Sequence, residues 1–376
     1  MSPSLRFPEF TGEWEYFSIN DVCSEFKSGK NIKADLISSN GNFPVYGGNG
    51  LRGYTSSYNH DGLYVLIGRQ GALCGNVRSV FGKIYITEHA IAVAGNEKSD
   101  TNFLHYLFLK MNLGQYSDQS AQPGLAVNKL LKLKVLLPSI SEQIKIAKLL
   151  SLIDERIAVQ SRLIDRLQSL MIGLNNSLYE QYGNDITTSF MELGYSYSGL
   201  SGKSAKDFGS GKPFITYLNV YSNIIVDETD YQYVRINDGE KQNIVRTGDV
   251  LFTLSSETPE EVGIGSVYLG EKEVYLNSFC FGIHIERDQL AYSPYLSYYV
   301  TSTAFRKFIY PFAQGSTRFN LCKADFEKAS IKLPSLDNQK RISAMLDCIA
   351  EKIQAEKAIL EYYNIQRQYL LRQMFI

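Results

Sequence analysis

The heptapeptide LPSISEQ at residues 137–143 is matched by LPSLDNQ at residues 333–339, and this repeated stretch decides the fold. The two copies are separated by 196 positions (333 − 137), and the correspondence continues without a gap, so that Ile146 matches Ile342. A match that keeps one offset over a long stretch indicates an internal duplication. We therefore expect one structural unit that is written twice.

An apolar heptad pattern follows each copy and predicts a long helix. The apolar residues recur at alternating intervals of about four and three positions, which is the a/d pattern of a coiled coil. Ser141 and Asp337 are the expected N-caps. Each helix would contain about 40 residues and extend for roughly 60 Å. The expected seam consists of Ile146, Leu150, Ile153, Ile157, Gln160, Ile164 and Leu167 in the first helix and of Ile342, Leu346, Ile349, Ile353, Glu356 and Leu360 in the second.

Two arrangements of these helices are open, because each could pack only on its own domain or the two could pack on each other. A seam of about five heptads is more than one small domain can bury, which favours a helix pair. If a twofold axis perpendicular to the helices relates the two halves, the pair is an antiparallel coiled coil. Gln160 and Glu356 hold equivalent positions near the helix centres (356 − 160 = 196), so we expect these polar side chains to face each other and fix the register.

The segments before the helices read as short strands and loops, each ending in an amphipathic helix. This pattern predicts an α+β fold with two β-rich domains in tandem pseudo-repeat, each followed by a long helix. The expected boundaries are 1–140 for the first domain, 141–182 for the central helix, 183–335 for the second domain and 336–376 for the C-terminal helix. The expected strands are 43–46, 63–68, 74–80, 83–86 and 91–94, then 212–217, 249–254, 265–268, 273–276 and 280–285; the expected amphipathic helices are 101–111 and 294–308.

Composition excludes several classes of protein. The chain of 376 residues has a net charge of −1, which argues against a strongly basic DNA-binding arm but leaves room for a local positive face. Its five cysteines form no C-x-x-C pair, so we expect neither a disulfide framework nor a zinc site. Because the N-terminal residues are polar, we expect no signal peptide. The sequence contains no run of about 18 apolar residues, so we expect no membrane-spanning helix. We expect a cytoplasmic protein.

Motifs that would carry catalysis are weak or incomplete. The G-x-G-x-x-G stretch at 48–53 is followed by residues typical of a strand or loop, although a nucleotide site requires a helix there. Gly202-Lys203-Ser204 resembles the end of a P-loop, but Tyr197 stands where the first glycine is required. The four histidines show no metal-ligand spacing, and we interpret His105 as a packed core residue. We predict a non-enzyme that holds no metal and no cofactor.

Polar side chains in strand-end loops are the remaining candidates for function. Arg69 and Gln70 follow an expected strand, and Arg52 lies in a glycine-rich loop. Arginine can bind the O6 and N7 atoms of guanine through two bonds, and glutamine can do the same with adenine. The corresponding loops of the second half carry a different set of side chains, which predicts that the two halves recognise different base sequences. The candidate DNA-binding residues are Arg52, Arg69, Gln70, Gln122, Ser255, Ser256, Thr258 and Arg318.

Several stretches resemble the specificity subunits of type I restriction–modification systems. They are LRFPEF at 5–10, VYGGNG at 45–50, IGRQG at 67–71 and TEHA at 87–90, together with the repeated Leu-Pro and glutamine at each helix start. The resemblance covers essentially the whole chain. Its second copy departs at Asn338, where the first copy has Glu142.

This resemblance implies a non-catalytic subunit with two target-recognition domains at opposite ends of an antiparallel helix pair. The domains would bind double-stranded DNA at two half-sites about one helical turn apart, roughly 34 Å. The implied partners are two modification (methyltransferase) subunits, which carry S-adenosylmethionine, and restriction subunits, which translocate and cleave DNA. Two alternatives stay open: a specificity subunit that serves a methyltransferase without a nuclease, and a scaffold or adhesion protein that does not bind DNA.

Overall fold

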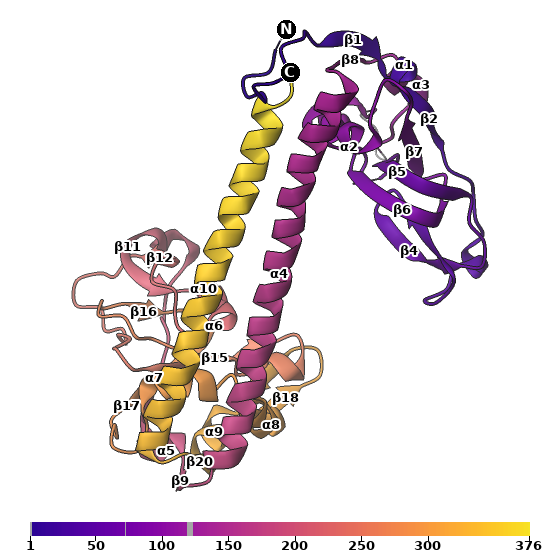
Figure 1. The fold of residues 1–376 in the computed structure, drawn as a ribbon. Coiled ribbons are helices and arrows are strands. Elements are labelled where there is room, and N and C mark those ends of the chain that lie inside the picture. The colour runs from indigo at the N-terminus through magenta and orange to yellow at the C-terminus, as the bar shows by residue number, and fades with distance from the viewer. Residues whose placement is uncertain (1, 72, 119–122) are drawn as a thin grey trace. The chain divides into compact units, whose positions relative to one another are not determined.

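The computed structural model describes residues 2–71, 73–118 and 123–376. The chain forms two compact units, of which the first contains Met1–Arg162 and Ala358–Ile376 and the second contains Leu163–Lys357. Both units include parts of the two long helices, α4 (Ile140–Tyr182) and α10 (Leu336–Gln373) (Figure 1). Each unit is described by itself below.

The first unit is built on a six-stranded sheet with the order β2-β7-β5-β6-β3-β4. Neighbouring strands pair antiparallel, except that β3 runs parallel to β6. A second, two-stranded ladder of β1 and β8 leads the chain into α4. The bounds are β1 Glu15–Ser18, α1 Ile19–Val22, β2 Cys23–Ser28, β3 Phe43–Gly47, β4 Gly50–Thr55, β5 His60–Gly68, β6 Val77–Ile86, β7 Ala90–Gly95, α2 Thr101–Met111, α3 Val127–Leu131 and β8 Lys134–Leu137.

The second unit repeats this plan in smaller sheets. Strands β10, β17, β13 and β15 form one sheet in that order, and the other sheets are β12-β11-β16, β14-β19-β18 and β20-β9. The bounds are β9 Ile186–Thr188, α5 Phe190–Leu193, β10 Gly194–Ser198, β11 Phe208–Ile215, α6 Tyr217–Ser222, β12 Tyr231–Val234, β13 Val250–Thr253, β14 Ser255–Ser256, β15 Gly265–Val267, β16 Tyr275–Leu276, β17 Cys280–Ile285, α7 Ser293–Tyr299, α8 Thr303–Ile309, β18 Ala313–Gly315, β19 Phe319–Leu321, α9 Lys323–Lys328 and β20 Ile331–Leu333.

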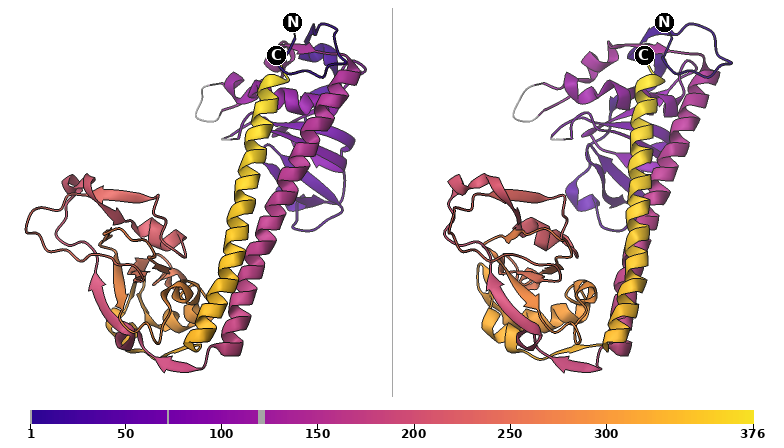
Figure 2. Two further views of the ribbon diagram at one scale, coloured as in Figure 1. Left: turned by 60° about the vertical axis from the view of Figure 1, so that its left-hand side comes forward. Right: turned by 90° about the vertical axis from the view of Figure 1, so that its left-hand side faces the viewer.

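Within each unit, the segments of the two long helices run antiparallel, as the sequence predicted. In the first unit, Leu150 near the start of α4 shares a core with Leu370 near the end of α10. In the second unit, Leu174 from the later part of α4 packs against the core that contains Leu346 from the early part of α10. Both helices can be followed side by side in all three views (Figure 1 and Figure 2).

Every expected seam position is buried or half-buried, including the polar ones. Glu356 is buried and forms an ion pair with Lys352, one turn earlier on the same helix. Gln160 belongs to the first unit and Glu356 to the second. The contact expected between them therefore stays a prediction.

The expected N-caps were wrong by two residues. α4 begins at Ile140, and Ser139 closes its first turn, since the Ser139 carbonyl accepts from the Gln143 N–H at 3.0 Å. Likewise α10 begins at Leu336, so Asp337 lies inside its first turn. In each repeat the serine that directly follows the proline precedes the helix. Oγ of Ser139 accepts from the Glu142 N–H at 3.4 Å, and the Ser335 carbonyl accepts from the Gln339 N–H at 2.9 Å.

Three further element predictions need correction. The strand expected over 212–217 ends at Ile215, because the side chain of Thr216 caps a helix, α6, that begins at Tyr217. The helix expected over 294–308 is broken into α7 and α8, because the side chain of Ser302 accepts from the Phe305 N–H and caps a new helix. The strands expected over 74–80 and 83–86 form one strand, β6, that begins only at Val77. Gly75 precedes it with a φ of 86°, a left-handed conformation that suits a turn rather than a strand.

A buried glutamine joins α4 to the first domain. Gln143 is 0% exposed, and its Oε1 accepts from the Asp100 N–H at 2.9 Å. Its Nε2 donates to the carbonyl oxygens of Lys98 and Pro138, both at 2.9 Å. The bonds to Asp100 and Lys98 tie the helix start to the backbone just before α2, and the bond to Pro138 holds the chain that leads into α4.

The second domain contains the same glutamine joint. Gln339 is 0% exposed, and its Oε1 accepts from the Tyr292 N–H at 2.8 Å. Its Nε2 donates to the carbonyl oxygens of Leu290 and Pro334 at 2.8 and 2.9 Å. The glutamine that ends each repeated heptapeptide therefore makes the same three bonds, which explains why the repeat includes it.

Candidate nucleic-acid interface

The loop after β5 holds the first group of expected DNA-contacting residues in a fixed backbone. The Arg69 N–H donates to the His89 carbonyl, and the Arg69 carbonyl accepts from the Leu125 N–H, both at 2.9 Å. The Gly71 N–H donates to the Pro123 carbonyl at 3.0 Å. Side chains that leave such a doubly bonded backbone are held in position, as a recognition site requires.

This loop forms one side of a pocket of about 410 Å³. The pocket brings together Arg52 and Gln70, two of the expected contacts. Arg69 is not part of its lining, and Gln122 lies outside the described residues. The lining consists of Gly47, Gly48, Asn49, Arg52, Gln70, Gly71 and His89.

Glycines of the β3–β4 hairpin let two arginines lie against its backbone, and one of them, Arg52, lines this pocket. A Cβ at Gly47 would come within 2.8 Å of the Arg52 side chain, and one at Gly50 within 2.9 Å of the Arg78 guanidinium. Gly50 also has a φ of 109°, which other residues rarely adopt. The G-x-G-x-x-G stretch therefore forms a hairpin followed by strand β4, with no helix to bind a phosphate, and it gathers positive charge.

His89 was not among the expected contacts, yet it organises the pocket. Its Nδ1 lies 3.1 Å from Oε1 of Gln70, and its Nε2 lies 3.2 Å from Oε1 of Glu88. The contact to Gln70 spans 19 residues and crosses from one loop to another, so no local pattern predicts it. The only signal in the sequence was its place in the TEHA stretch.

The second domain repeats the backbone geometry of the first. The Leu254 N–H donates to the Phe279 carbonyl, and the Leu254 carbonyl accepts from the Leu321 N–H, both at 2.9 Å. Leu254 is thus equivalent to Arg69, and Phe279 is equivalent to His89. The next residue is Gln70 in the first domain and Ser255 in the second, so different side chains occupy the same structural position.

Arg318 lies near the tip of the β18–β19 hairpin and is exposed. Its guanidinium carbon is 6.0 Å from the centre of the Phe279 ring, and its Nη2 donates to Oγ of Ser255 at 3.3 Å. Phe279 is itself 57% exposed, which is unusual for a phenylalanine. A stacked arginine on a hairpin tip is well placed to meet a base edge or a phosphate.

The remaining expected contacts of this domain differ in accessibility. Ser255 and Ser256 are buried, and the Ser256 hydroxyl donates to Glu261 at 3.0 Å. Hydrogen bonds from Tyr221 and Ser256 lower the pKa of Glu261, so this carboxylate stays charged. Thr258 is exposed. The two serines thus hold Arg318 and Glu261 in place, while Thr258 faces solvent.

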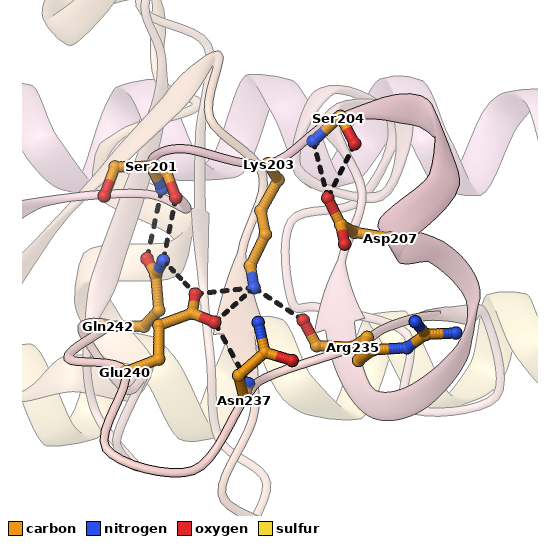
Figure 3. A network of polar contacts seen from close by, with 8 residues as sticks. All are labelled: Ser201, Lys203, Ser204, Asp207, Arg235, Asn237, Glu240 and Gln242. Carbon is orange, nitrogen blue, oxygen red and sulfur yellow. Dashed lines mark hydrogen bonds and ion pairs between the residues drawn. The ribbon is translucent and has the colours of Figure 1, made fainter.

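The P-loop-like Gly202-Lys203-Ser204 has a structural role (Figure 3). Nζ of Lys203 donates to Oε2 of Glu240 and to the Arg235 carbonyl, both at 2.6 Å, and its side chain is 6% exposed. The Lys203 hydrogen bond is the main reason that the pKa of Glu240 falls to about 2. Lys203 is therefore committed to a loop contact and is not available to a nucleotide.

The buried Asp249 pairs with His284 in the second domain and has a structural role. Asp249 is 0% exposed and accepts from Tyr197 and from the Arg246 N–H, while its Oδ1 lies 2.6 Å from Nδ1 of His284. These bonds tie β10, β13 and β17 together. Among the residues that the structure describes, no group of three or more His, Cys, Asp or Glu side chains could hold a metal ion. Within the same residues, no helix is long and apolar enough to cross a membrane.

The fold and these loops define a class of protein: a duplicated recognition protein whose two domains present different polar side chains from equivalent strand ends. The family model of the type I restriction modification DNA specificity domain matches the chain twice, at residues 11–169 and 200–362. The chain therefore belongs to the DNA specificity subunits of type I restriction–modification systems, which are non-catalytic subunits.

Relatives agree with this assignment. The specificity subunit of the type I restriction enzyme EcoprrI from Escherichia coli is 45% identical over 154 residues, which are 40% of this chain and 38% of that protein. A Haemophilus influenzae protein assigned as a type I restriction enzyme specificity subunit is 23% identical over 361 residues, or 89% of this chain and 87% of that protein. The match to EcoprrI thus spans well under half of that relative.

Solved structures show the same fold. The S subunit of a type I restriction–modification system from M. genitalium superposes with a TM-score of 0.64 and 17% identity, covering 100% of this chain and 99% of that one. A chain from a structural study of assembly and conformational transition of the type I R-M system gives a TM-score of 0.59 at 17% identity, covering 98% and 99%.

Proposed function

We propose that each β-rich domain reads one half-site of a bipartite DNA target. The observation that carries this proposal is the pair of equivalent loops that differ in their side chains, with Gln70 in the first domain and Ser255 in the second. Arg52 lines the same pocket as Gln70, and Arg318 donates a hydrogen bond to Ser255. Arginine and glutamine are the side chains that best discriminate bases in the major groove. The expected contacts Arg69, Gln122, Ser255, Ser256 and Thr258 remain part of the proposal.

The near-neutral net charge is compatible with DNA binding for a local reason. Arg52 lines the pocket of the first domain, Arg78 lies against Gly50 of the β3–β4 hairpin, and Arg318 projects from a hairpin of the second domain. A few local cations can orient a duplex, while subunits of a larger complex share the contacts to the phosphates.

We further propose that the long helices carry the partner subunits. In the first unit, α10 exposes Tyr362, Ile365 and Tyr369 by 71%, 54% and 55%, at intervals of three and four residues. Large apolar side chains in a row on an exposed helix face are typical of a docking surface. On the α4 side, Leu152 and Val159 border a groove of about 310 Å³. The proposed occupants are helices of two modification (methyltransferase) subunits, which would also carry S-adenosylmethionine.

The remaining features of the proposal concern the assembly as a whole. The proposed boundaries are 1–140 and 183–335 for the recognition domains and 141–182 and 336–376 for the helices, whose length would set the spacing of the half-sites. Restriction subunits would join the complex to translocate and cleave DNA, and the complex would work in the cytoplasm.

Methylation mapping tests this function most directly. A host that carries this chain as its sole specificity subunit is expected to methylate one split sequence throughout its genome, and deletion of the gene is expected to remove that methylation. In vitro, the complex with its modification subunits should lose affinity steeply as salt rises, because phosphate contacts release counterions. If the complex shows no salt-dependent binding to DNA of any sequence, the result would instead support a scaffold that does not bind DNA. Cleavage of unmodified DNA on addition of the restriction subunit separates a restriction system from a methyltransferase alone.

A further inference from the structure

His89 and Phe279 hold equivalent positions in the two domains, and each contacts a side chain that we expect to bind DNA. The His89 and Phe279 carbonyls accept the same backbone hydrogen bond in their respective domains. In the second domain, the exposed Phe279 ring stacks with the Arg318 guanidinium. In the first, the His89 imidazole contacts the amide of Gln70. Both residues thus support a neighbouring side chain, but only the imidazole can gain or lose a proton.

Both ring nitrogens of His89 face oxygen atoms. Nε2 lies 3.2 Å from Oε1 of Glu88, and Nδ1 lies 3.1 Å from Oε1 of Gln70. A carboxylate and an amide carbonyl oxygen accept hydrogen bonds and do not donate them. Both bonds can form at once only when both nitrogens carry hydrogen, as they do in the charged imidazole. In this arrangement the Nε2 amino group of Gln70 faces away from His89 as a donor.

If His89 loses one proton, Gln70 must offer its Nδ1 atom a hydrogen-bond donor instead of an acceptor. Glu88 accepts only, so the hydrogen stays on Nε2 and Nδ1 becomes an acceptor. The Gln70 amide then satisfies Nδ1 by turning its amino group inward, which leaves its Oε1 facing outward. This exchange needs only rotation of the side chain, because backbone bonds of Arg69 and Gly71 hold the loop.

We propose that His89 is a positioning residue that sets which end of the Gln70 amide faces DNA, and hence which base is preferred at one position of the first half-site; this rests on the proposed DNA-reading function. With the charged imidazole, Gln70 offers a donor, which suits O6 and N7 of guanine or O4 of thymine. With the neutral imidazole it offers an acceptor, which suits the amino group of adenine or cytosine. The charged groups around this site are Glu88 beside His89, Arg52 of β4 in the same pocket and Arg78 of β6 at the adjoining hairpin.

The test compares base preferences at every position of both half-sites at pH 6 and pH 8, a range in which imidazoles titrate. It uses the full chain assembled with its modification subunits and a randomised split DNA duplex. The wild-type complex is expected to change its preference at one position of the first half-site by about tenfold, the size of one base-edge contact. The second half-site, whose support is Phe279, is the internal control and is expected to stay unchanged.

Two variants separate the role of His89 from a merely structural one. His89→Phe copies the residue at the equivalent position of the second domain, so the loop should fold; it is expected to lose the pH-dependent change in base preference. Gln70→Glu is an acceptor in both conditions and is expected to fix the adenine or cytosine preference at both pH values. A change that persists in His89→Phe, or that affects both half-sites equally, overturns the role of His89 but leaves DNA reading intact. A wild-type complex without sequence preference at either pH overturns the proposed function and this inference together.

Discussion

Replacing Arg6 by alanine is expected to destabilise the first unit strongly, because it breaks a buried ion pair. Nε and Nη2 of Arg6 donate to Oε1 and Oε2 of Glu142, each at 2.7 Å, and the Glu142 side chain is 1% exposed. Removing one partner of a buried pair typically costs about 3–5 kcal/mol, since the other charge stays buried. A pocket borders both residues and admits water to the vacated space, so we expect a loss near the lower end, about 3 kcal/mol.

The single tryptophan makes this loss measurable in the first unit alone. Trp14 is 4% exposed and packs against Phe103 and Phe375 in the core of that unit. Its fluorescence during urea unfolding therefore reports on this unit and not on the second. With a urea dependence of about 2 kcal/mol per molar, the unfolding midpoint should fall by roughly 1.5 M.

A matched pair of variants controls for the loss of the arginine itself. Glu142→Asn reproduces the second copy of the repeat, where Asn338 stands, and should cost only about 1–2 kcal/mol, since Arg6 is partly exposed and can be hydrated. Adding Glu142→Asn to the Arg6→Ala chain should restore at least about 1 kcal/mol, because the unpaired charge disappears. A double variant whose loss equals the sum of the single losses would refute the buried-charge explanation.

Further predictions concern the proposed DNA-contacting residue Arg318, the long helices and the loop that contains Glu240. Arg318→Ala is expected to relax base preference in one half-site by about 1–3 kcal/mol in a binding competition, whereas neighbouring Thr317→Ala should leave it unchanged. Leu150→Ala, at a fully buried seam position, should cost about 3 kcal/mol in the tryptophan assay, whereas Leu152→Ala, at a position 46% exposed, should change stability by less than about 0.5 kcal/mol. Deleting seven residues at equivalent places in both long helices shortens each by about 10 Å, so methylation mapping should find the same half-sites with about three fewer base pairs between them. Unchanged spacing would contradict the proposal that helix length sets the distance between the half-sites. The pKa of Glu240 is lowered from 4.5 to about 2, so its stabilising contribution is present above about pH 4.5 and is lost as the pH falls toward 2. Glu240→Gln should therefore speed the hydrogen exchange of residues 236–243 at pH 6. The difference from the wild type should disappear as the pH approaches 2.

Much of the architecture could be predicted from sequence because its signals are periodic. The heptad pattern and the offset of 196 residues (333 − 137) located both long helices, since every turn of a helix repeats the same burial requirement. Strand β17 and helix α2 were predicted at the bounds that the structure shows. The N-caps were misplaced because Ser139 and Ser141 are chemically equal candidates, and only the backbone after Pro138 distinguishes them.

The candidate site was less predictable because its contacts are not local. Arg52 and Gln70 were predicted separately, but their meeting in one pocket depends on the β3–β4 hairpin and the β5 loop folding together. The supporting residues His89 and Phe279 were missed, since their equivalence becomes visible only through matching backbone hydrogen bonds. Likewise the ion pair between Arg6 and Glu142 spans 136 positions, and no spacing rule predicts it.

The glutamine joint has a consequence for how new specificities can arise. Gln143 and Gln339 bond only to backbone atoms of their domains, so the joint does not depend on which side chains a domain displays. Genetic exchange with crossovers at the two repeated heptapeptides would graft a foreign domain onto an unchanged attachment point. Such chimaeras should fold at once and inherit the donor's preferred base sequence, which makes the duplicated gene a natural site for shuffling.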